Sequence, residues 1–435
     1  MKPVVIIGGG AAGIAAACTL AERGKRIFLL ERAPRLGGRA ASFFHHLMRQ
    51  EVDYGYHILM RCCTETIDLV RQLRMERSVS FQERLAIPIA CGSKRSLLSS
   101  APLPGPLHLL PSLMRYRPLS YRERIAVLRA GLFLLVHDPQ KGRTFADWLR
   151  CHGQEKNAIA RLWEPICIAT LNERPNAVSA RAAGMIFKKG FLKPHGADMG
   201  LFTVPLSHLF SRAISFLAER EGEVLLNAQV AQILIEKGAA RGVRLVSGER
   251  IDSDCVIAAV PPFDLLSLLP QAVVEKGYFA GMKKIRFSPI VNLHLWFDRP
   301  VMEEPFLVVI DSPVQAVFDV SRIQGKEGPT HVVLSQSAAR DLINRPNEEI
   351  RNQLLAALEE LFPAVRTAKL LDALVIRHPR ATFLPTPGNE ALRPGPQGPI
   401  EGLLLAGDYT ATGWPSTIEG AVRSGRAAAA LVWHG

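Results

Sequence analysis

Three glycines near the N-terminus, Gly8, Gly10 and Gly13, have the spacing that binds the diphosphate of a dinucleotide. They follow an apolar run over residues 4–7 and open a stretch of small residues over 11–22, a pattern typical of strand, turn and helix. Gly8 permits the tight turn, Gly10 lets backbone approach a phosphate, and Gly13 lets the helix lie close to the strand. The free N–H groups at the helix start then attract the anion.

An acidic residue completes this candidate site. Glu31 ends a second apolar run over residues 26–30, where its carboxylate can accept hydrogen bonds from ribose hydroxyls. A carboxylate there also disfavours a 2′-phosphate. We expect Arg32 beside it, and Ala12 at the helix start, to lie against the same ligand.

Two adjacent glycines and an arginine follow Glu31 closely. Gly37 and Gly38 allow backbone to lie flat against a ligand, and Arg39 can pair with a phosphate or a carboxylate. In isolation this would read as a surface turn with a solvated arginine. Its position directly after the acidic residue favours a ligand contact.

A second group of residues with the chemistry of a binding site lies near the C-terminus. Gly407 and Asp408 end an apolar run, and a helix is predicted to start near Thr417 and Ile418. Such a helix start can stabilise negative charge on the ring of a reduced flavin. Asp408 can hydrogen-bond the ribityl or phosphate region, and Trp414 is expected to flank the ring, although plain packing would also account for it.

Taken in order, these motifs resemble the amine oxidase and carotenoid desaturase superfamily of flavoproteins. The resemblance covers the whole chain in outline and is most specific at its two ends. It implies an α/β fold, in which a Rossmann-type FAD-binding domain of the glutathione reductase kind carries an inserted mixed α+β substrate domain. It also implies FAD as cofactor, with backbone near Val230 at the adenine end. Since the last cysteine is Cys255, the C-terminal thioether that some members form to flavin cannot form here.

Three further segments resemble the squalene-associated FAD-dependent desaturases, also called hydroxysqualene dehydroxylases, of bacterial hopanoid pathways. The segments are residues 53–57, 102–110 and 162–167. In the first of them the family usually has Asn-Gly-Gln before the histidine, where this chain has Tyr-Gly-Tyr before His57.

One position separates this chain from the amine oxidases. When the chain is aligned on Phe-Asp-Arg-Pro at 297–300, amine oxidases usually carry a lysine that water bridges to flavin N5, and this chain has Asn292. Asn292 is therefore a candidate active-site residue. On a strand it shares one face with His294 and Trp296, and this face either lines the substrate cavity or packs against solvent or a neighbouring strand.

The resemblance implies reduction of hydroxysqualene to squalene with loss of water, in hopanoid and squalene biosynthesis. Protonation of the allylic hydroxyl needs a general acid, and hydride transfer to the developing cation needs a water-poor apolar cavity. His57 is the first candidate for the acid and Glu164 the second, unless the histidine is held by backbone or the glutamate by an ion pair. The alternatives are a carotenoid-type isoprenoid desaturase, a flavin amine oxidase, and a non-catalytic lipid carrier.

The charge balance points to a polyanionic partner. The 435 residues contain 53 Lys and Arg against 40 Asp and Glu, a net charge of +13. Basic residues interleaved with apolar ones between Leu103 and Val136 favour an anionic membrane surface over nucleic acid, although an ordinary basic surface would show the same pattern. No apolar run approaches the ~20 residues of a spanning helix. The seven cysteines have no CxxC spacing, so neither a metal site nor a disulfide framework is predicted.

From these features we expect a cytoplasmic protein that associates peripherally with the inner membrane and takes a long apolar isoprenoid as its substrate. No cleavable signal peptide is predicted. The sequence indicates a discontinuous FAD-binding domain over residues 1–75, 205–262 and 400–435. The substrate domain is predicted over residues 76–204 and 263–399.

The remaining predicted elements lie mostly in this substrate domain. Helical spacing is found over 64–73, 125–136 and 347–362, and apolar runs over 285–297 and 330–336 are typical of strands. Before the second helix, Ser120 and Glu123 have the spacing of a capping box.

Overall fold

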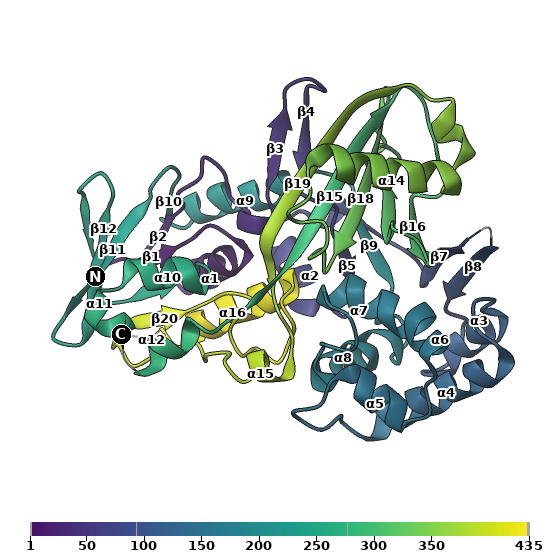
Figure 1. The fold of residues 1–435 in the computed structure, drawn as a ribbon. Coiled ribbons are helices and arrows are strands. Elements are labelled where there is room, and N and C mark those ends of the chain that lie inside the picture. Colours follow the sequence, from purple (N-terminus) through teal and green to yellow (C-terminus); the bar gives the residue numbers. More distant parts are fainter. Residues whose placement is uncertain (1, 93, 276, 433–435) are drawn as a thin grey trace.

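A five-stranded parallel sheet forms the end of the molecule that holds both termini (Figure 1). The computed structural model describes residues 2–92, 94–275 and 277–432. The strand order is β10-β2-β1-β14-β20, and every neighbouring pair is parallel. The strands are β1 (Val4–Ile7), β2 (Ile27–Leu30), β10 (Glu223–Leu225), β14 (Val256–Ala258) and β20 (Leu403–Leu405). The first, middle and last parts of the chain therefore share one sheet, and the predicted Rossmann-type α/β class is confirmed.

Helices from the two termini pack against each other beside this sheet. Helix α1 (Ala11–Glu22) lies along α16 (Ile418–Ala430) so closely that a Cβ atom added to Gly425 would overlap the carbonyl oxygen of Ala12. Helices α2 (Thr64–Gln72) and α9 (Leu206–Ala218) share the same hydrophobic core. This packing brings the two predicted helix starts into one region.

A second core covers the other side of the parallel sheet. It contains the antiparallel strands β11 (Val230–Glu236), β12 (Ala239–Leu245) and β13 (Arg250–Asp252). Short helices α10 (Pro262–Leu268), α11 (Gln271–Val274) and α12 (Gly277–Met282) follow. Leu265, Phe279 and Met282 join this core, which therefore extends past residue 262, where the middle FAD-binding segment was predicted to end. The domain boundaries themselves stay a prediction.

A seven-stranded mixed sheet forms the upper part of the opposite end in Figure 1, in the order β19-β15-β18-β17-β16-β7-β8. Its strands are β7 (Ala86–Cys91), β8 (Lys94–Ser99), β15 (Phe287–Phe297), β16 (Phe306–Ile310), β17 (Ala316–Asp319), β18 (Thr330–Ser337) and β19 (Leu370–Phe383). Helix α14 (Asn347–Leu361) packs on one face. The structure confirms the predicted strands β15 and β18, whereas β19 was not predicted. Because β19 is an edge strand, it accommodates Pro379 and several charged residues. These residues interrupt the alternation of apolar and polar side chains that would identify a strand.

A helical unit lies below this sheet. It consists of α3 (Leu110–Arg115), α4 (Tyr121–Val136), α5 (Phe145–Cys151), α6 (Lys156–Ala158), α7 (Glu164–Leu171) and α8 (Ala180–Ile186), with π-helical turns over Ile159–Trp163 and Phe187–Phe191. Ser120 and Glu123 form the predicted capping box. Within the described ranges, none of the helices combines the length and apolar character needed to cross a membrane.

Small elements connect these parts. The hairpin β3 (Ser42–His45) and β4 (Gln50–Asp53) leads through residues 54–57 into the three-stranded sheet of β5 (Ile58–Met60), β9 (Met199–Phe202) and β6 (Val79–Phe81). Short helices α13 (Val320–Gln324) and α15 (Pro387–Glu390) complete the fold. The segment that carries His57 thus bridges the cofactor end and the helical unit.

Candidate active site

One cavity of about 1420 Å³ runs from the glycine turn after β1 to the helical unit. Ligand pockets typically have volumes of roughly 300–1000 Å³, so this one has room for a cofactor and a second molecule together. Gly8, Glu31 and Val230 line one end, and Leu162 and Phe191 line the other.

The glycine turn has the geometry expected of a diphosphate site. Gly8 has a φ of +104°, and a Cβ atom on it would lie 2.7 Å from the carbonyl oxygen of Ala259. A Cβ atom on Gly13 would overlap the Gly8 carbonyl oxygen, whereas Gly10 faces open space. Helix α1 has no side-chain cap and no acidic residue in its first turn, so its N–H groups are left for an anion.

The acidic residue at the end of β2 holds the turn in place. Glu31 accepts hydrogen bonds from the backbone N–H of Gly9 at 2.7 Å and of Ala33 at 2.8 Å, and its side chain lines the cavity. Arg32 lies at the same rim, 3.5 Å from Asp264. Ala12 also lines this end of the cavity.

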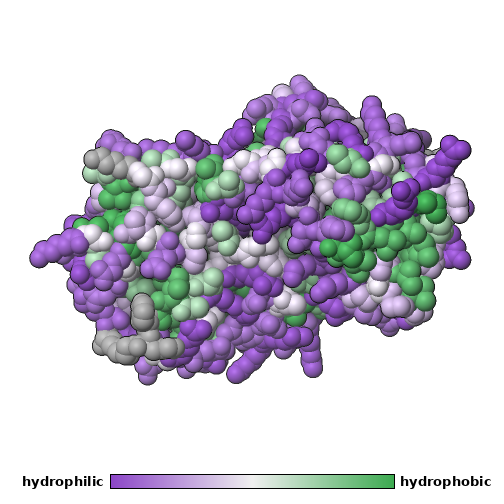
Figure 2. Space-filling view, turned by 90° about the horizontal axis from the view of Figure 1, so that it is seen from below, coloured by the Kyte–Doolittle hydropathy of each residue, from purple (hydrophilic) through white to green (hydrophobic). Residues whose placement is uncertain are grey.

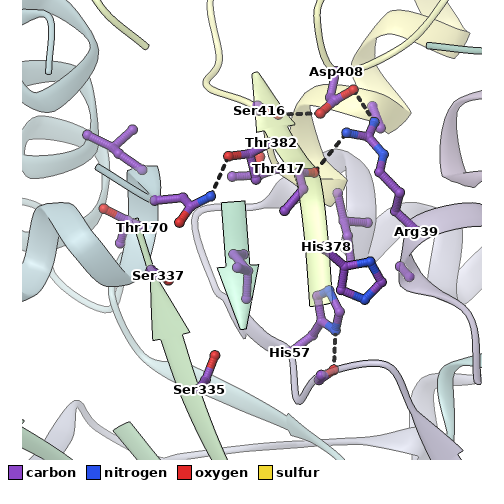
Figure 3. A pocket seen from close by; sticks show the side chains of 18 of the residues that line it. Arg39, His57, Thr170, Ser335, Ser337, His378, Thr382, Asp408, Ser416 and Thr417 are labelled. Carbon is purple, nitrogen blue, oxygen red and sulfur yellow. Dashed lines mark hydrogen bonds and ion pairs between the residues drawn. The ribbon is translucent and has the colours of Figure 1, made fainter. Parts of the chain in front are cut away.

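Arg39 and Asp408, predicted separately as cofactor ligands, bind each other. The guanidinium pairs with the Asp408 carboxylate and donates to the carbonyl oxygen of Ala381 at 2.8 Å (Figure 3). The hydroxyl of Ser416 donates to the second oxygen of the same carboxylate. Gly38, with a φ of +58°, brings this arginine against the glycine turn, where a Cβ atom would lie 3.3 Å from the Gly10 Cα atom. The N-terminal and C-terminal motifs therefore meet at one point of the cavity wall.

The second helix start opens into the same cavity. Thr417 caps α16 by accepting a hydrogen bond from the N–H of Gly420 at 3.1 Å, and Ile418 begins the helix. Gly407 donates its N–H to the hydroxyl of Ser424 at 2.7 Å. Trp414 is buried in the wall, with the Arg423 guanidinium 4.9 Å from the centre of its ring.

His57 lines the cavity between the cofactor end and the apolar end. Its Nδ1 lies 2.8 Å from the carbonyl oxygen of Gly55, so Nδ1 carries the proton and Nε2 is left for the cavity. Burial lowers the pKa of His57, the bond to Gly55 opposes this, and neighbouring His378 lowers it further. His57 is therefore held by backbone, as the alternative to a catalytic role required. Its second ring nitrogen is still free to act in the cavity.

Of Asn292, His294 and Trp296 on the mixed face of β15, Asn292 lines the cavity and the other two do not. The Asn292 amide donates to the carbonyl oxygen of Tyr54 at 3.0 Å, and its own oxygen is buried without a hydrogen-bond partner. His294 and Trp296 instead pack among buried rings, with Trp296 stacked on His331 at 4.5 Å. These two residues therefore pack against neighbouring strands and do not line the substrate cavity.

Glu164, the second candidate acid, begins α7 at the cavity wall. Its carboxylate lies 2.6 Å from the guanidinium of Arg174. Burial raises the pKa of Glu164, while the charge of Arg174 opposes that rise. The glutamate is thus held in an ion pair, the structural role that sequence reasoning left open.

Sequence reasoning missed two residues, one in the cavity wall and one that supports the wall from outside. His378 lies on the unpredicted strand β19 and faces the cavity near His57. Arg393 donates to the carbonyl oxygens of Trp414 at 2.7 Å and Asp408 at 3.0 Å, which fixes the loop before α16. Neither residue belongs to a local motif, so only a correct assignment of β19 could have drawn attention to His378.

The far end of the cavity is mainly apolar, although the Arg161–Asp311 ion pair and the polar side chain of Gln315 also line the cavity. Its aliphatic and aromatic side chains come from the mixed sheet and the helical unit, and include Ile87, Ile89, Leu98, Leu162, Ile166, Ile186, Phe191, Val308, Ile310 and Phe318. Tyr116 contributes its ring but directs its hydroxyl away, donating to the carbonyl oxygen of Arg161 at 2.7 Å. This end suits a long hydrocarbon chain.

The chain belongs to the flavin containing amine oxidoreductase family, whose sequence model matches residues 11–433. It is similar to the hydroxysqualene dehydroxylase of Rhodopseudomonas palustris, with 30% identity over 445 residues that cover 99% of this chain and 98% of that protein. It is 27% identical to the 15-cis-phytoene desaturase of Solanum lycopersicum over 453 residues, covering 99% and 77%. An oxidoreductase from Methanosarcina mazei shares the fold, with a TM-score of 0.79 at 18% identity over 98% and 99% of the two chains.

FAD is the cofactor of this protein, as the family match establishes. The residues present fit it. The open space at Gly10 and the free N–H groups of α1 suit the diphosphate, and Glu31 suits the adenosine ribose. The start of α16 suits the ring. The protein is therefore a flavin-dependent oxidoreductase.

Proposed function

We propose that this oxidoreductase reduces hydroxysqualene to squalene with loss of water. The observation that carries the proposal is the single cavity that joins the FAD motifs to an apolar chamber. Within the described residues no lysine lines this cavity, and Asn292 stands where amine oxidases usually have one. The 30% identity to a hydroxysqualene dehydroxylase over nearly the full length of both chains supports the same assignment.

The chain's own residues would perform three tasks in this reaction. The aliphatic wall binds the hydrocarbon and excludes water, which favours hydride capture over hydration of an allylic cation. The free Nε2 of His57 is placed to hold a proton for the leaving hydroxyl. Asn292 anchors the backbone of the segment that carries this histidine. Bound FAD in its reduced form supplies the hydride.

The test is anaerobic incubation of the dithionite-reduced holoenzyme with hydroxysqualene, followed by mass spectrometry of the extracted lipid. We expect squalene to form while the flavin absorbance returns. The absence of squalene, with the flavin remaining reduced, would contradict the proposal. The Gly10→Ala variant, which should lack FAD, is the matched control.

Isoprenoid desaturation is the second candidate, because several plant and cyanobacterial 15-cis-phytoene desaturases match nearly the whole chain at about 27% identity. The same apolar chamber would hold a carotenoid precursor. Oxidised holoenzyme mixed anaerobically with phytoene would then lose its flavin absorbance. The dehydroxylase proposal expects no such bleaching.

We also propose that the helical unit contacts an anionic membrane on the cytoplasmic face of the inner membrane. Figure 2 shows an apolar patch on the underside of the molecule, at the end that carries α3 and α4. Its exposed side chains include Leu103, Leu107, Leu132, Leu135 and Val136. The exposed arginines Arg115, Arg117, Arg122 and Arg129 lie in and around the same two helices. An apolar surface flanked by cations is suited to lipid tails and acidic head groups.

Flotation with vesicles tests this contact. We expect the protein to float with vesicles that contain phosphatidylglycerol and to float less with phosphatidylcholine alone. Leu132→Asp combined with Leu135→Asp should abolish flotation. Ile214→Asp, at an exposed position on α9, is the control and should not. Equal flotation of all three proteins would refute the assignment of this surface.

A further inference from the structure

Two histidines that are distant in the sequence lie together in the cavity wall. His57 follows the β3–β4 hairpin, and His378 lies on β19. Figure 3 shows their rings next to each other, near Thr417 and Arg39. Both side chains line the cavity, and a charge on His378 is close enough to lower the pKa of His57.

Each ring has a nitrogen that no described residue satisfies. The Nδ1 of His57 is occupied by the Gly55 carbonyl at 2.8 Å, which leaves Nε2. The Nε2 of His378 is buried and has no hydrogen-bond partner within the described part of the chain. Buried polar atoms are nearly always paired in native proteins. The unpaired Nε2 of His378 therefore points to a proton or bound group that the pair acquires.

The surroundings of the pair favour the neutral form of both rings. Arg39 faces His378 and lowers its pKa further after the main effect of burial, while Asp408 neutralises much of that arginine's charge. The ring of Tyr54 meets that of His378 edge-on at 5.3 Å. The Nε2 of His294 lies 3.4 Å from the Tyr54 carbonyl oxygen, and burial lowers the pKa of His294 to about 4. None of these groups offers an anion directly to the pair, so a nearby negative charge would act on it strongly.

We propose that His57 and His378 form one proton site, which is empty while FAD is oxidised and takes up a single proton when FAD is reduced. The start of α16, which fits the flavin ring, opens beside them. A reduced flavin that stays anionic places a negative charge at this point, which favours the charged form of an imidazole. Two adjacent, half-buried imidazoles can hold one proton but not two, because their charges would repel.

The atoms and electrons balance in both directions. On reduction by dithionite, two electrons and two protons enter, and one proton stays on the flavin while the other stays on the histidine pair. In the dehydroxylation the carbon–oxygen bond breaks, hydride forms the new carbon–hydrogen bond, and the pair's proton leaves with the hydroxyl as water. Transfer of this proton to the leaving hydroxyl rests on the proposed function. Uptake of the proton does not, because it needs only FAD and the reductant.

The test is the midpoint potential of the holoenzyme measured against pH without any substrate. A two-electron potential shifts by about 30 mV per pH unit for each proton taken up. We expect about 60 mV per pH unit for the wild type near neutral pH, together with the absorption spectrum of an anionic reduced flavin. His57→Gln and His378→Gln should each show about 30 mV. The control His46→Gln, at an exposed position, should match the wild type.

Two results would overturn the proposal. One is a wild-type slope of about 30 mV, or a neutral reduced flavin, since either leaves no proton on the protein. The other is an unchanged slope in His378→Gln, since the pair would then not act as a unit. If the variants do not fold, nitrogen-15 resonances of histidine in the oxidised and reduced wild type decide the matter. The proposal requires one imidazole to become charged on reduction.

Discussion

The two ends of the cavity are built in different ways. At the dinucleotide end, backbone meets backbone, and Gly8 and Gly13 stand where any side chain would collide. At the apolar end, side chains from the mixed sheet and the helical unit converge, and residues such as Leu162 and Val308 come from distant parts of the chain. The first end depends on short-range geometry that a motif records, whereas the second depends on tertiary packing that no motif records.

The largest expected effect comes from the glycine turn. Gly13→Ala should destabilise the fold by more than about 3 kcal/mol, because its Cβ atom would overlap the Gly8 carbonyl oxygen in a packed core. Gly10→Ala has open space, so it should fold normally and lose FAD instead. Thermal unfolding and flavin absorbance separate the two outcomes. If both variants were equally stable, close backbone contact at Gly13 would not be required for folding of the dinucleotide end.

At the side-chain end, His57→Gln and Glu164→Gln should differ sharply. Loss of a general acid typically slows a reaction by about 10²–10⁴-fold, so we expect a fall in kcat of at least about 100-fold for His57→Gln. Glu164 is engaged by Arg174, and its variant should lose less than about tenfold. Anaerobic single-turnover reoxidation of the flavin by hydroxysqualene measures both. A larger loss for Glu164→Gln would reverse the assignment of the acid.

The rings of His294, Trp296 and His331 form a buried cluster. Burial of His294 in this cluster should make the stability of the protein depend on pH. Burial lowers the pKa of His294 from its ordinary value near 6.5 to about 4. The unfolded chain therefore binds the proton first, and about 3 kcal/mol of stability is lost as pH falls from about 6.5 to 4.

The matched variant for this measurement is His294→Gln. Asp53 acts in the opposite sense, because burial raises its pKa to about 6 and its contribution is lost as pH rises from about 4 to 6. The difference in unfolding free energy between wild type and His294→Gln removes the Asp53 contribution. A difference that does not change between pH 4 and 7 would contradict the assigned burial effect.

The smallest effect is expected where the two termini meet. Asp408→Asn removes the buried carboxylate that Arg39 and Ser416 share, and should cost about 2 kcal/mol, less than a fully buried pair because Arg39 is partly exposed. Asp147→Asn, in an exposed pair with Arg150, should change stability by less than about 0.5 kcal/mol. Urea unfolding compares them. Equal, small effects would mean that this junction is held by packing alone.

The sequence by itself was sufficient for strands β1, β2 and β20 of the parallel sheet, the helices α1 and α16, and the cofactor turn. Each rests on local constraints: the glycine spacing, the capping residue Thr417 and the short apolar runs act over a few residues, and the structure places them as expected. The resemblance to flavoproteins depended on these same residues, and the family match confirms it.

Only the tertiary structure decided which side chains meet. Arg39 pairs with Asp408, Glu164 with Arg174, and His57 lies beside His378. The partner of His57 lies on β19, an edge strand whose proline and charged residues mask its periodicity. Contacts between residues hundreds of positions apart depend on how whole elements pack, and that packing is a property of the complete core that no single segment encodes.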